Sequence, residues 1–401
     1  MIEGIAARNF KSLGNFKLQL GQFTCLIGMN GAGKTSILQA IDFMAQLMVG
    51  RIDEWLAMRD WAPGDLVSKF SPSANIQLAL TFRTQSGQLV GWAGQFHRQT
   101  LACSTENLTV DSVPVLTVRA QVLKVVGAPE LQGPIGFTYQ GSVLSQIRSE
   151  SLPPAALEFR EAMRKIRSLE LLAPNLMRRR ARSSESDIGA GGEKLSAFLD
   201  TIRGAEREKL RHLLQSFYPR LEDFKITSQR AGWKKLSVFE RFGDHRIETE
   251  ARHINDGLLR VLAILAQAAS NRSLILLDEI ENGINPEIVE TLVDALLASP
   301  QQMLVTTHSP MILNYLPDDT ARQALQFVYK NPAGQTRVRP FFSIAHIASK
   351  LEVMGPGEAF VDTDLNALTT ECVQQDTDDE ERLRAALAAQ AEEVLSRIEI
   401  P

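Results

Sequence analysis

Apolar residues in the first third of the chain predict strands around one helix. Residues 2–27 have the spacing of short strands, and residues 23–27 form a compact apolar run, typical of a strand buried on both faces. Residues 35–48 place apolar side chains at helical spacing. Residues 75–145 return to strand-like alternation between glycine-containing turns.

The rest of the chain mixes helical and strand-like segments. Residues 155–215 have a helical composition that Pro174 and the glycines near residue 190 interrupt. Residues 222–250 predict a pair of β-hairpins, and from residue 256 onward helices alternate with short apolar strands. The pattern predicts an α/β fold.

A glycine-rich loop joins the apolar strand to the first helix. Residues 28–35, GMNGAGKT, fit the phosphate-binding pattern GxxxxGK[ST] in full, between the strand and helix that this pattern requires. Glycines let backbone N–H groups point at phosphates, and the helix N-terminus adds positive potential. We therefore expect Lys34 to bridge the β- and γ-phosphates of ATP and Thr35 to hold Mg²⁺. The other expected nucleotide contacts are Asn30, Gly31, Ala32, Gly33 and Ser36.

A second apolar strand, at residues 273–277, ends in Asp278 and Glu279. The carboxyl ends of the strands face the ligand crevice in open α/β sheets. We expect Asp278 to complete the Mg²⁺ shell and Glu279 to be the general base that polarises the attacking water. The alternative is a strand that ends in two solvated acids, and the phosphate-binding loop in the same chain favours the metal site.

A third strand of the same kind, at residues 303–306, leads into Thr307 and His308. A histidine at this strand end can reach the γ-phosphate and report its presence. The alternative is a structural histidine. The interval between His308 and Glu279 favours the sensor role.

These elements, in this order, resemble the ABC-type ATPase heads of the SMC/RecF/OLD group. They look most similar to compact bacterial AAA family ATPases, which often lie beside anti-phage or toxin genes. The resemblance rests on ARNFKSL at residues 7–13, DEIENGINP at 278–286 and TTHSP at 306–310. It implies a P-loop NTPase head of the ABC/RecF type, with a mixed central sheet and an inserted helical and β lobe. It also implies a set of residues near the nucleotide base: Asn9, Lys11 and Ser12.

Two motifs depart from the family. INDGLLR at residues 254–260 occupies the position of LSDGTLR, whose serine and glycine contact the γ-phosphate of ATP bound to the opposite protomer. Here Asn255 replaces the serine, while Gly257 is kept, and an amide NH₂ can still donate a hydrogen bond. The alternative is that Asn255 only caps the following helix. Asn285 replaces the family's D-loop histidine.

A Q-loop glutamine is not identified from the sequence. Three glutamines are candidates without a feature that separates them: Gln77, Gln95 and Gln99.

The resemblance suggests a division into two halves of one head, an insert and a tail. The tail holds an acidic run at residues 376–381 ahead of a predicted helix at 379–398, and the run is expected to be a solvated linker. The N-terminal part of the head is expected at 1–150, the inserted lobe at 151–250, the C-terminal part at 251–340 and the tail at 341–401.

In the family, ATP bound to one protomer is clamped by the signature of another, so a monomer holds half a site. We expect an ATPase that forms a homodimer or a higher homo-oligomer. It would be the regulatory ATPase of an anti-phage or toxin system, controlling a separately encoded nuclease or toxin. One alternative is a DNA-engaging ATPase of the recombination-mediator type. The other is a nucleotide-dependent scaffold with negligible turnover.

Missing features favour the regulatory ATPase over the DNA-engaging one. The sequence has no sustained heptads for coiled-coil arms, and about 60 residues after residue 340 are too few for a TOPRIM nuclease domain. Asp362 and Asp364 form a DxD pattern, which is expected to cap a helix or to be solvated rather than to bind metal.

Composition agrees with an ordinary globular protein of two or three lobes: 401 residues, 44% hydrophobic and 22% charged. Three cysteines without CxxC spacing argue against a disulfide framework or a zinc site. The sequence shows no signal-peptide pattern and no apolar run long enough to span a membrane, so we expect a cytoplasmic protein.

The net charge of −4 argues against a nucleic-acid binder that is basic throughout, so any such contact needs a local patch. One basic cluster could contact nucleic-acid phosphates, be a solvated helix end or bind an acidic partner. Its members are Arg178, Arg179, Arg180 and Arg182.

Overall fold

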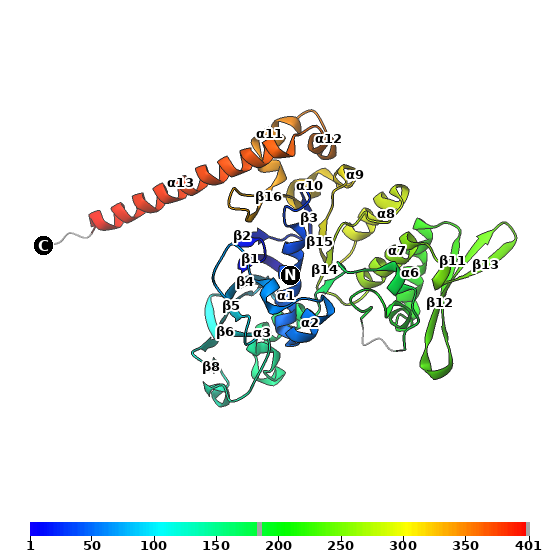
Figure 1. The fold of residues 1–401 in the computed structure, drawn as a ribbon, viewed down its shortest axis with the longest axis horizontal. Coiled ribbons are helices and arrows are strands. Elements are labelled where there is room, and N and C mark those ends of the chain that lie inside the picture. The colour runs from blue at the N-terminus through cyan, green and yellow to red at the C-terminus, as the bar shows by residue number, and fades with distance from the viewer. Residues whose placement is uncertain (183–186, 398–401) are drawn as a thin grey trace.

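The computed structural model describes residues 1–182 and 187–397, which form three sheets with helices around them (Figure 1). The six-stranded sheet has the order β10-β14-β15-β3-β16-β17, and only β17 runs antiparallel to its neighbour. Its strands are β3 (Phe23–Ile27), β10 (Arg167–Ser168), β14 (Leu274–Leu277), β15 (Gln302–Thr306), β16 (Leu325–Lys330) and β17 (Thr336–Pro340).

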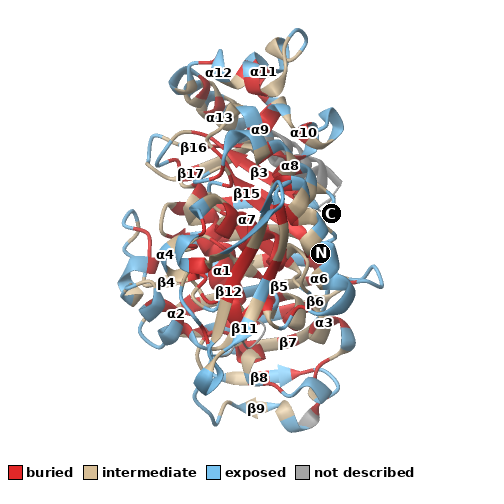
Figure 2. Ribbon diagram, turned by 90° about the vertical axis from the view of Figure 1, so that its right-hand side faces the viewer, coloured by how far each residue is buried: buried red, intermediate tan, exposed pale blue. Residues whose placement is uncertain are grey.

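Successive residues of the six-stranded sheet face two different cores, as the two-residue period of a strand requires. Leu276 of β14 packs with residues of α1 (Lys34–Val49). Its neighbour Ile275 packs with residues of α7 (Asp256–Ala268) and α8 (Pro286–Leu297). All residues of β3, β14 and β15 are buried, so the predicted strands with two covered faces are confirmed (Figure 2).

The eight-stranded sheet is antiparallel throughout, with the order β2-β1-β4-β5-β6-β7-β8-β9. Burial alternates along its strands, because one face packs against α1 and α3 (Pro154–Arg164) while the other is more exposed. Its strands are β1 (Ile2–Phe10), β2 (Leu13–Gln19), β4 (Asn75–Arg83), β5 (Leu89–His97), β6 (Ala102–Val110), β7 (Val113–Arg119), β8 (Val122–Val125) and β9 (Gly133–Pro134).

Two elements after residue 150 pack with the first part of the head. Helix α3 packs in the core that it shares with α1, and β10 extends the six-stranded sheet beside β14. We therefore propose that the first part of the head continues through β10, to about residue 170. Helix α2 (Ile52–Met58) packs against the same core through Trp55.

The inserted lobe contains a three-stranded antiparallel sheet, β11-β12-β13, whose two turns form the predicted pair of hairpins. It lies on the opposite side of the six-stranded sheet from β8 in Figure 1. Its elements are α4 (Pro174–Met177), α5 (Leu195–Leu199), α6 (Gly204–Phe217), β11 (Leu221–Ser228), β12 (Lys234–Phe242) and β13 (His245–Glu250).

The C-terminal tail ends in one long helix, α13 (Leu365–Arg397). It starts well before the predicted residue 379, because Leu368 and Cys372 are buried against the body; residue 398 lies outside the described residues. Among the described residues, no helix is long and apolar enough to cross a bilayer. The shorter helices before α13 are α9 (Pro310–Asn314), α10 (Asp318–Ala324), α11 (Ala345–Lys350) and α12 (Pro356–Val361).

Candidate nucleotide-binding site

The glycine-rich loop lies between the end of β3 and the start of α1, and two of its glycines are required by close approach. Gly28 has a φ of 142°, and a Cβ atom there would lie 2.2 Å from the Val328 carbonyl oxygen. Gly33 has a φ of 109°, and a Cβ atom there would lie 2.0 Å from the Thr336 hydroxyl oxygen. The loop therefore keeps its tight curve only with glycine at these positions.

Lys34 points back into the curve of the loop. Its Nζ donates to the carbonyl oxygens of Gly28 at 2.8 Å and Met29 at 3.1 Å, and lies 3.5 Å from Nδ1 of His308. Burial lowers the pKa of Lys34 to about 8, although Asp278 and Glu279 act in the opposite direction. A bound phosphate group would replace these carbonyl oxygens and pair its negative charge with the Lys34 ammonium.

The hydroxyl of Thr35 and the carboxylate of Asp278 meet directly. Thr35 Oγ1 donates to Asp278 Oδ2 at 2.8 Å, which joins the first turn of α1 to the end of β14. Thr306, at the end of β15, donates from Oγ1 to Asp278 Oδ1 at 2.5 Å and accepts from the Glu279 N–H at 2.8 Å. A hydroxyl beside a carboxylate is the oxygen chemistry that Mg²⁺ prefers, so these side chains fit the ion.

Glu279 and His308 face each other next to this pair. Nε2 of His308 lies 3.5 Å from Oε1 of Glu279, and the Glu279 side chain is 46% exposed. Glu279 has a φ of 48°, a backbone strain of the kind that clusters at functional sites. The His308 N–H donates to Oε1 of Glu281 at 2.8 Å, while Oε2 of Glu281 is buried with no described partner. The expected base and sensor are therefore brought together.

The sequence analysis did not single out Thr306 or Glu281. Thr306 was part of the quoted TTHSP motif, but a threonine inside an apolar strand gives no separate signal. Its role depends on strand β15 lying beside β14, which the register Leu277↔Val305 establishes. Glu281 was part of the motif after Asp278, and only the fold shows that it accepts from the His308 backbone.

The three N-terminal residues expected near the base lie at different depths. Ser12 is against the phosphate loop, since its hydroxyl contacts that of Thr336 at 2.8 Å, and Thr336 donates to the Ala32 carbonyl at 2.8 Å. Asn9 is buried, and its amide donates to the Ser73 and Asn75 carbonyls at 2.9 and 2.8 Å. Its NH₂ group is thus already used inside the fold.

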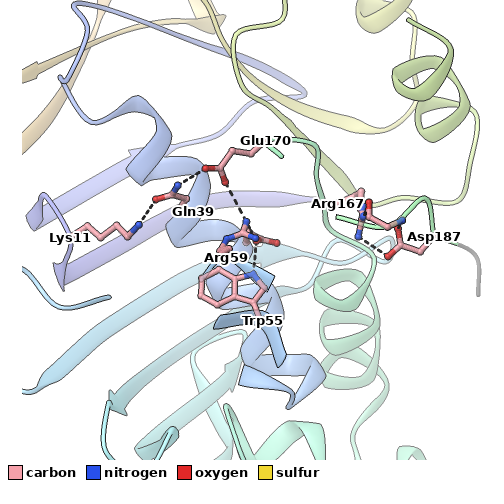
Figure 3. A network of polar contacts seen from close by, with 9 residues as sticks. Lys11, Gln39, Trp55, Arg59, Arg167, Glu170 and Asp187 are labelled. Atoms are coloured by element: carbon pink, nitrogen blue, oxygen red, sulfur yellow. Dashed lines mark hydrogen bonds and ion pairs between the residues drawn. The ribbon is translucent and has the colours of Figure 1, made fainter. Parts of the chain in front are cut away.

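Lys11 enters a polar network beside α1 (Figure 3). Its Nζ donates to Oε1 of Gln39 at 2.7 Å and lies 3.3 Å from the centre of the Trp61 ring. Burial lowers its pKa to about 8. Gln39 in turn donates to the carboxylate of Glu170. The network therefore links the β1–β2 turn to the P-loop helix and to the segment after β10.

Glu170 is a further residue that the sequence did not single out. Leu169 N–H donates to the Leu276 carbonyl at 2.8 Å, so Glu170 follows a strand that runs beside β14. Burial raises the pKa of Glu170, and the charge of Asp278 acts in the same direction, against the hydrogen bond from Gln39 and the nearby Arg59. Arg59 holds Glu170 at 3.3 Å (Figure 3). It also pairs with Asp42 at 2.8 Å.

The three Q-loop candidates lie elsewhere. Gln77 and Gln95 are register partners on β4 and β5 of the eight-stranded sheet, and Gln99 is in the turn after β5. Among the described residues, Gln39 on α1 is the glutamine whose side chain donates a hydrogen bond to Glu170.

The signature segment begins helix α7. Asn255 caps it by accepting from the Leu258 N–H at 2.8 Å, and the described residues offer no partner to its amide nitrogen. A Cβ atom at Gly257 would lie 3.0 Å from the Gly283 carbonyl oxygen. Asn285 similarly caps α8 by accepting from the Glu287 N–H at 3.3 Å.

The arginine cluster is divided between fold contacts and solvent. Arg178 donates to the Ile254 carbonyl at 2.7 Å and to Asp256 Oδ1 at 2.5 Å. It therefore contacts the residues immediately before and after Asn255. Arg182 donates to the Ala231 carbonyl at 3.0 Å and stacks over Trp233. Arg179 and Arg180 are exposed, and residues 183–186, which follow the cluster, lie outside the described residues.

The two aspartates of the DxD pattern make local contacts. Asp362 pairs with Lys350 at 3.0 Å, and Asp364 accepts from the Asn366 N–H at 2.8 Å at the start of α13. This confirms the predicted capping role for Asp364. Within residues 1–182 and 187–397, no three His, Cys, Asp or Glu side chains gather as a metal site would need; the hydroxyl–carboxylate pair above is of a different kind.

Comparisons with known proteins agree with this geometry. A family model described as "AAA domain, putative AbiEii toxin, Type IV TA system" matches residues 142–314, and one described as "AAA domain" matches residues 5–102. The OLD nuclease of Thermus scotoductus is 36% identical over 83 residues, which are 20% of this chain and 14% of that protein. The match thus spans a small part of the relative's length.

Solved structures show the same fold. An SMC head bound to the C-terminal winged-helix domain of ScpA aligns with a TM-score of 0.52 at 18% identity, covering 84% of this chain and 96% of that one. The SMC head of Pyrococcus furiosus with an extended coiled coil aligns with a TM-score of 0.51 at 14% identity, covering 84% and 95%. The chain thus has the P-loop NTPase fold of SMC heads, and two separate segments of it match AAA-domain family models.

Proposed function

We propose that the chain binds ATP with Mg²⁺, hydrolyses it, and holds the nucleotide between two protomers. The observation that carries the proposal is the direct contact of Thr35 with Asp278, with Glu279 and His308 beside it. Thr35 and Asp278 would hold the Mg²⁺ ion, which would neutralise charge on the β- and γ-phosphates. Lys34 would exchange its carbonyl contacts for those phosphates.

Glu279 is well placed to be the general base. Its carboxylate is part exposed, so a water molecule can reach it, and the Thr306 hydroxyl fixes its backbone N–H at 2.8 Å. His308 lies between this carboxylate and the Lys34 ammonium, at 3.5 Å from each. That position supports a contact of His308 with the γ-phosphate, and through it a response to whether the phosphate is present.

The second half of the site would come from another protomer. Asn255 and Gly257 stand at the exposed N-terminus of α7, where the helix dipole and the free amide nitrogen can meet phosphate oxygens. Arg178 supports this assignment, because its two hydrogen bonds fix the backbone and side chain on either side of Asn255. ATP would then stabilise a head-to-head dimer, and hydrolysis would release it.

The test separates hydrolysis from binding. Glu279→Gln should lower the ATPase rate by about 10²–10⁴-fold and leave ATP binding intact, because only proton abstraction is lost. Lys34→Ala should lose both. Glu290→Gln, an exposed glutamate on α8, is the matched control and should keep the wild-type rate. A wild type that binds ATP without measurable turnover would instead favour the nucleotide-dependent scaffold.

We further propose that the ATPase regulates a separately encoded effector, a nuclease or a toxin, in anti-phage defence inside the cytoplasm. Support comes from the matching family model, whose description names a toxin system, and from the likeness to an OLD nuclease. Co-expression with the product of the adjacent reading frame tests this role. Effector activity or phage protection should change between wild type and Glu279→Gln, and the absence of any change in both would reject the role.

A further inference from the structure

The inserted lobe carries the opposite net charge to the rest of the chain. Residues 174–253, from the start of α4 to the turn before α7, hold 17 basic and 12 acidic side chains, a net charge of +5. The whole chain has a net charge of −4, so the remaining residues have −9. The sheet of this lobe projects from the body in Figure 1. An anionic partner would therefore be attracted to the inserted lobe and repelled by the remainder.

Two segments that are distant in sequence meet in this lobe. Ala181, after α4, forms an antiparallel bridge with Lys234 of β12, whose N–H donates to the Ala181 carbonyl at 2.8 Å. This register places Arg182 opposite Trp233. Ala181 is buried, whereas its neighbours Arg180 and Arg182 are exposed, so the two arginines project from the other side of the segment. The arginine segment and the β11–β12 turn thus lie side by side.

An exposed tryptophan is part of the surface where these segments meet. Trp233 is 39% exposed, and the Arg182 guanidinium lies 5.3 Å from the centre of its ring. Nε of Arg182 also donates to the Ala231 carbonyl at 3.0 Å, which fixes the guanidinium beside the indole. Ala231 has a φ of 59°, a conformation that residues other than glycine rarely adopt. An exposed indole beside a guanidinium is a platform on which a flat nucleobase can stack.

Cations on this surface outnumber the carboxylates available to neutralise them. Glu250 pairs with Lys235 at 3.1 Å and with Arg252 at 3.4 Å. Its pKa is lowered first by the hydrogen bond from Lys235, and then by the charges of Arg252 and Arg180, so one carboxylate serves three cations. Three further exposed cations have no ion pair with a described carboxylate: Arg179, Arg182 and Arg230. We call the following residues the basic turn surface: Arg179, Arg180, Arg182, Arg230, Trp233 and Lys235.

We propose that the basic turn surface binds single-stranded nucleic acid, with its arginines on the backbone phosphates and Trp233 stacked on a base. A single strand offers both groups at once, because its bases are unpaired and can be stacked on an aromatic side chain. In a duplex the faces of the bases are covered by their neighbours, so the indole would have nothing to stack on. An acidic protein segment would pair with the cations but would bring no base to the indole.

The basic turn surface lies beside the signature segment. It begins one residue after Arg178, whose hydrogen bonds reach the residues before and after Asn255. Arg252, three residues before Asn255, shares Glu250 with Lys235. A bound strand would therefore lie next to the segment that we propose closes over the ATP of another protomer. Binding of the strand itself needs no ATP, so its test is independent of the nucleotide site.

The test uses the nucleotide-free full chain and labelled oligothymidine of about 20 nucleotides, longer than the site of a typical single-strand binding fold. Binding should be saturable and should weaken as salt rises, because each phosphate contact releases counterions. The double variant Arg180→Glu/Arg230→Glu should weaken binding about tenfold or more and flatten the salt dependence. Arg8→Glu/Arg119→Glu, the same charge change at exposed positions of the eight-stranded sheet, is the matched control and should bind like the wild type.

Trp233 provides a second, independent measurement. Trp233→Ala should weaken binding about tenfold through loss of the stacked base, while the salt dependence stays that of the wild type. Trp233→Phe should restore most of the affinity, because phenylalanine also presents a flat ring. Phe242→Ala, which removes an exposed ring at the other end of β12, is the control and should bind like the wild type. Thermal unfolding of every variant is measured alongside, so that a folding defect is not mistaken for lost binding.

Oligouridine of the same length separates the two sources of a single strand. Tighter binding of oligouridine than of oligothymidine would identify RNA as the ligand, the reverse order would identify DNA, and equal affinities would show that the sugar is not read. Equal binding of both oligonucleotides to the wild type and to Arg180→Glu/Arg230→Glu would overturn the proposal.

Duplex DNA and polyglutamate test the other two classes of partner. A duplex of oligothymidine with its complement that binds as tightly as the single strand, with no effect of Trp233→Ala, would reject a single-strand site. Polyglutamate that binds the wild type but not the double variant, while neither oligonucleotide binds, would assign the basic turn surface to an acidic protein and would likewise reject the proposal.

Discussion

The two sheets of the head place their polar side chains in different positions. The central strands of the six-stranded sheet are parallel and covered on both faces, so the site residues Asp278 and Thr306 stand where strands end. The eight-stranded antiparallel sheet is covered on one face, so Arg8, Lys17 and Arg119 stand along the other. A parallel sheet thus concentrates a reaction site at one edge, whereas an antiparallel sheet offers a broad surface on which another molecule can dock.

The largest effect is expected at the edge of the parallel sheet. Asp278→Asn should lower ATPase activity by about 10³-fold, because a metal ligand contributes several kcal/mol of charge stabilisation. Nucleotide affinity should also lose its dependence on Mg²⁺, which calorimetry with and without the ion measures. Asp294→Asn, an exposed aspartate on α8, is the control. Equal ATPase rates for the two variants would show that Asp278 is not part of the metal site.

In the antiparallel sheet, we expect the contribution of one buried carboxyl group to stability to depend on pH. Glu106 on β6 is buried, and burial raises its pKa from 4.5 to about 7, against hydrogen bonds from Ser142, the Val143 N–H and Trp92. A raised acid pKa means that the folded state binds the proton more tightly. Its contribution to stability is therefore present below about pH 4.5 and is lost as the pH rises through 7.

Glu106→Gln keeps the shape of the side chain without the charge. The free energy of unfolding of the wild type, relative to this variant, should fall by up to about 3 kcal/mol between pH 4.5 and 7.5. Urea unfolding at both pH values measures it. A difference that stays constant across this range would show that Glu106 does not titrate on unfolding.

Arg178 tests whether the inserted lobe supports the nucleotide site. Arg178→Ala removes both hydrogen bonds around Asn255 and should lower the ATP-dependent association about tenfold, while ATP affinity of the monomer is unchanged. Arg179→Ala, one residue away and exposed, should leave both unchanged. If Arg179→Ala has the same effect as Arg178→Ala, the cluster acts through its charge on an anionic partner instead.

The smallest effect is expected at Asn255 itself. Asn255→Ser restores the residue that the family motif has here and should leave the thermal unfolding curve close to wild type, because serine caps a helix about as well. Asn255→Ala should cost about 1 kcal/mol, because the Leu258 N–H loses its acceptor. If Asn255→Ser also lowers the free energy of unfolding by about 1 kcal/mol, the amide nitrogen of Asn255 has a partner within the folded protein.

Much of the parallel sheet could be predicted from sequence. The loop at Lys34 and the strand before Asp278 carry local patterns, and their contact follows from the rule that parallel strands end at one edge. Glu170 could not be found in this way. The strand that precedes it, β10, is two residues long, and only its pairing with β14 brings Glu170 towards Asp278.

The contacts of the arginine cluster and the hollow on the eight-stranded sheet also depend on residues that are distant in sequence, so the sequence did not reveal them. Four arginines in five positions suggested one basic surface, but Arg178 and Arg182 turn to carbonyl oxygens that are distant in sequence. The hollow on the open face of the eight-stranded sheet is lined by Ala6, Ala79 and Ala93 from three strands, and a lone alanine in a strand gives no signal. Long-range pairing, rather than local pattern, creates both features.

The most direct test of a nucleotide held between two protomers is the mass of Glu279→Gln in solution with and without ATP and Mg²⁺. ATP should raise the mass by association of two copies, and Gly257→Arg in the same background should abolish that rise while calorimetry still detects bound ATP. A protein that binds ATP stoichiometrically and keeps the same mass would contradict the shared site.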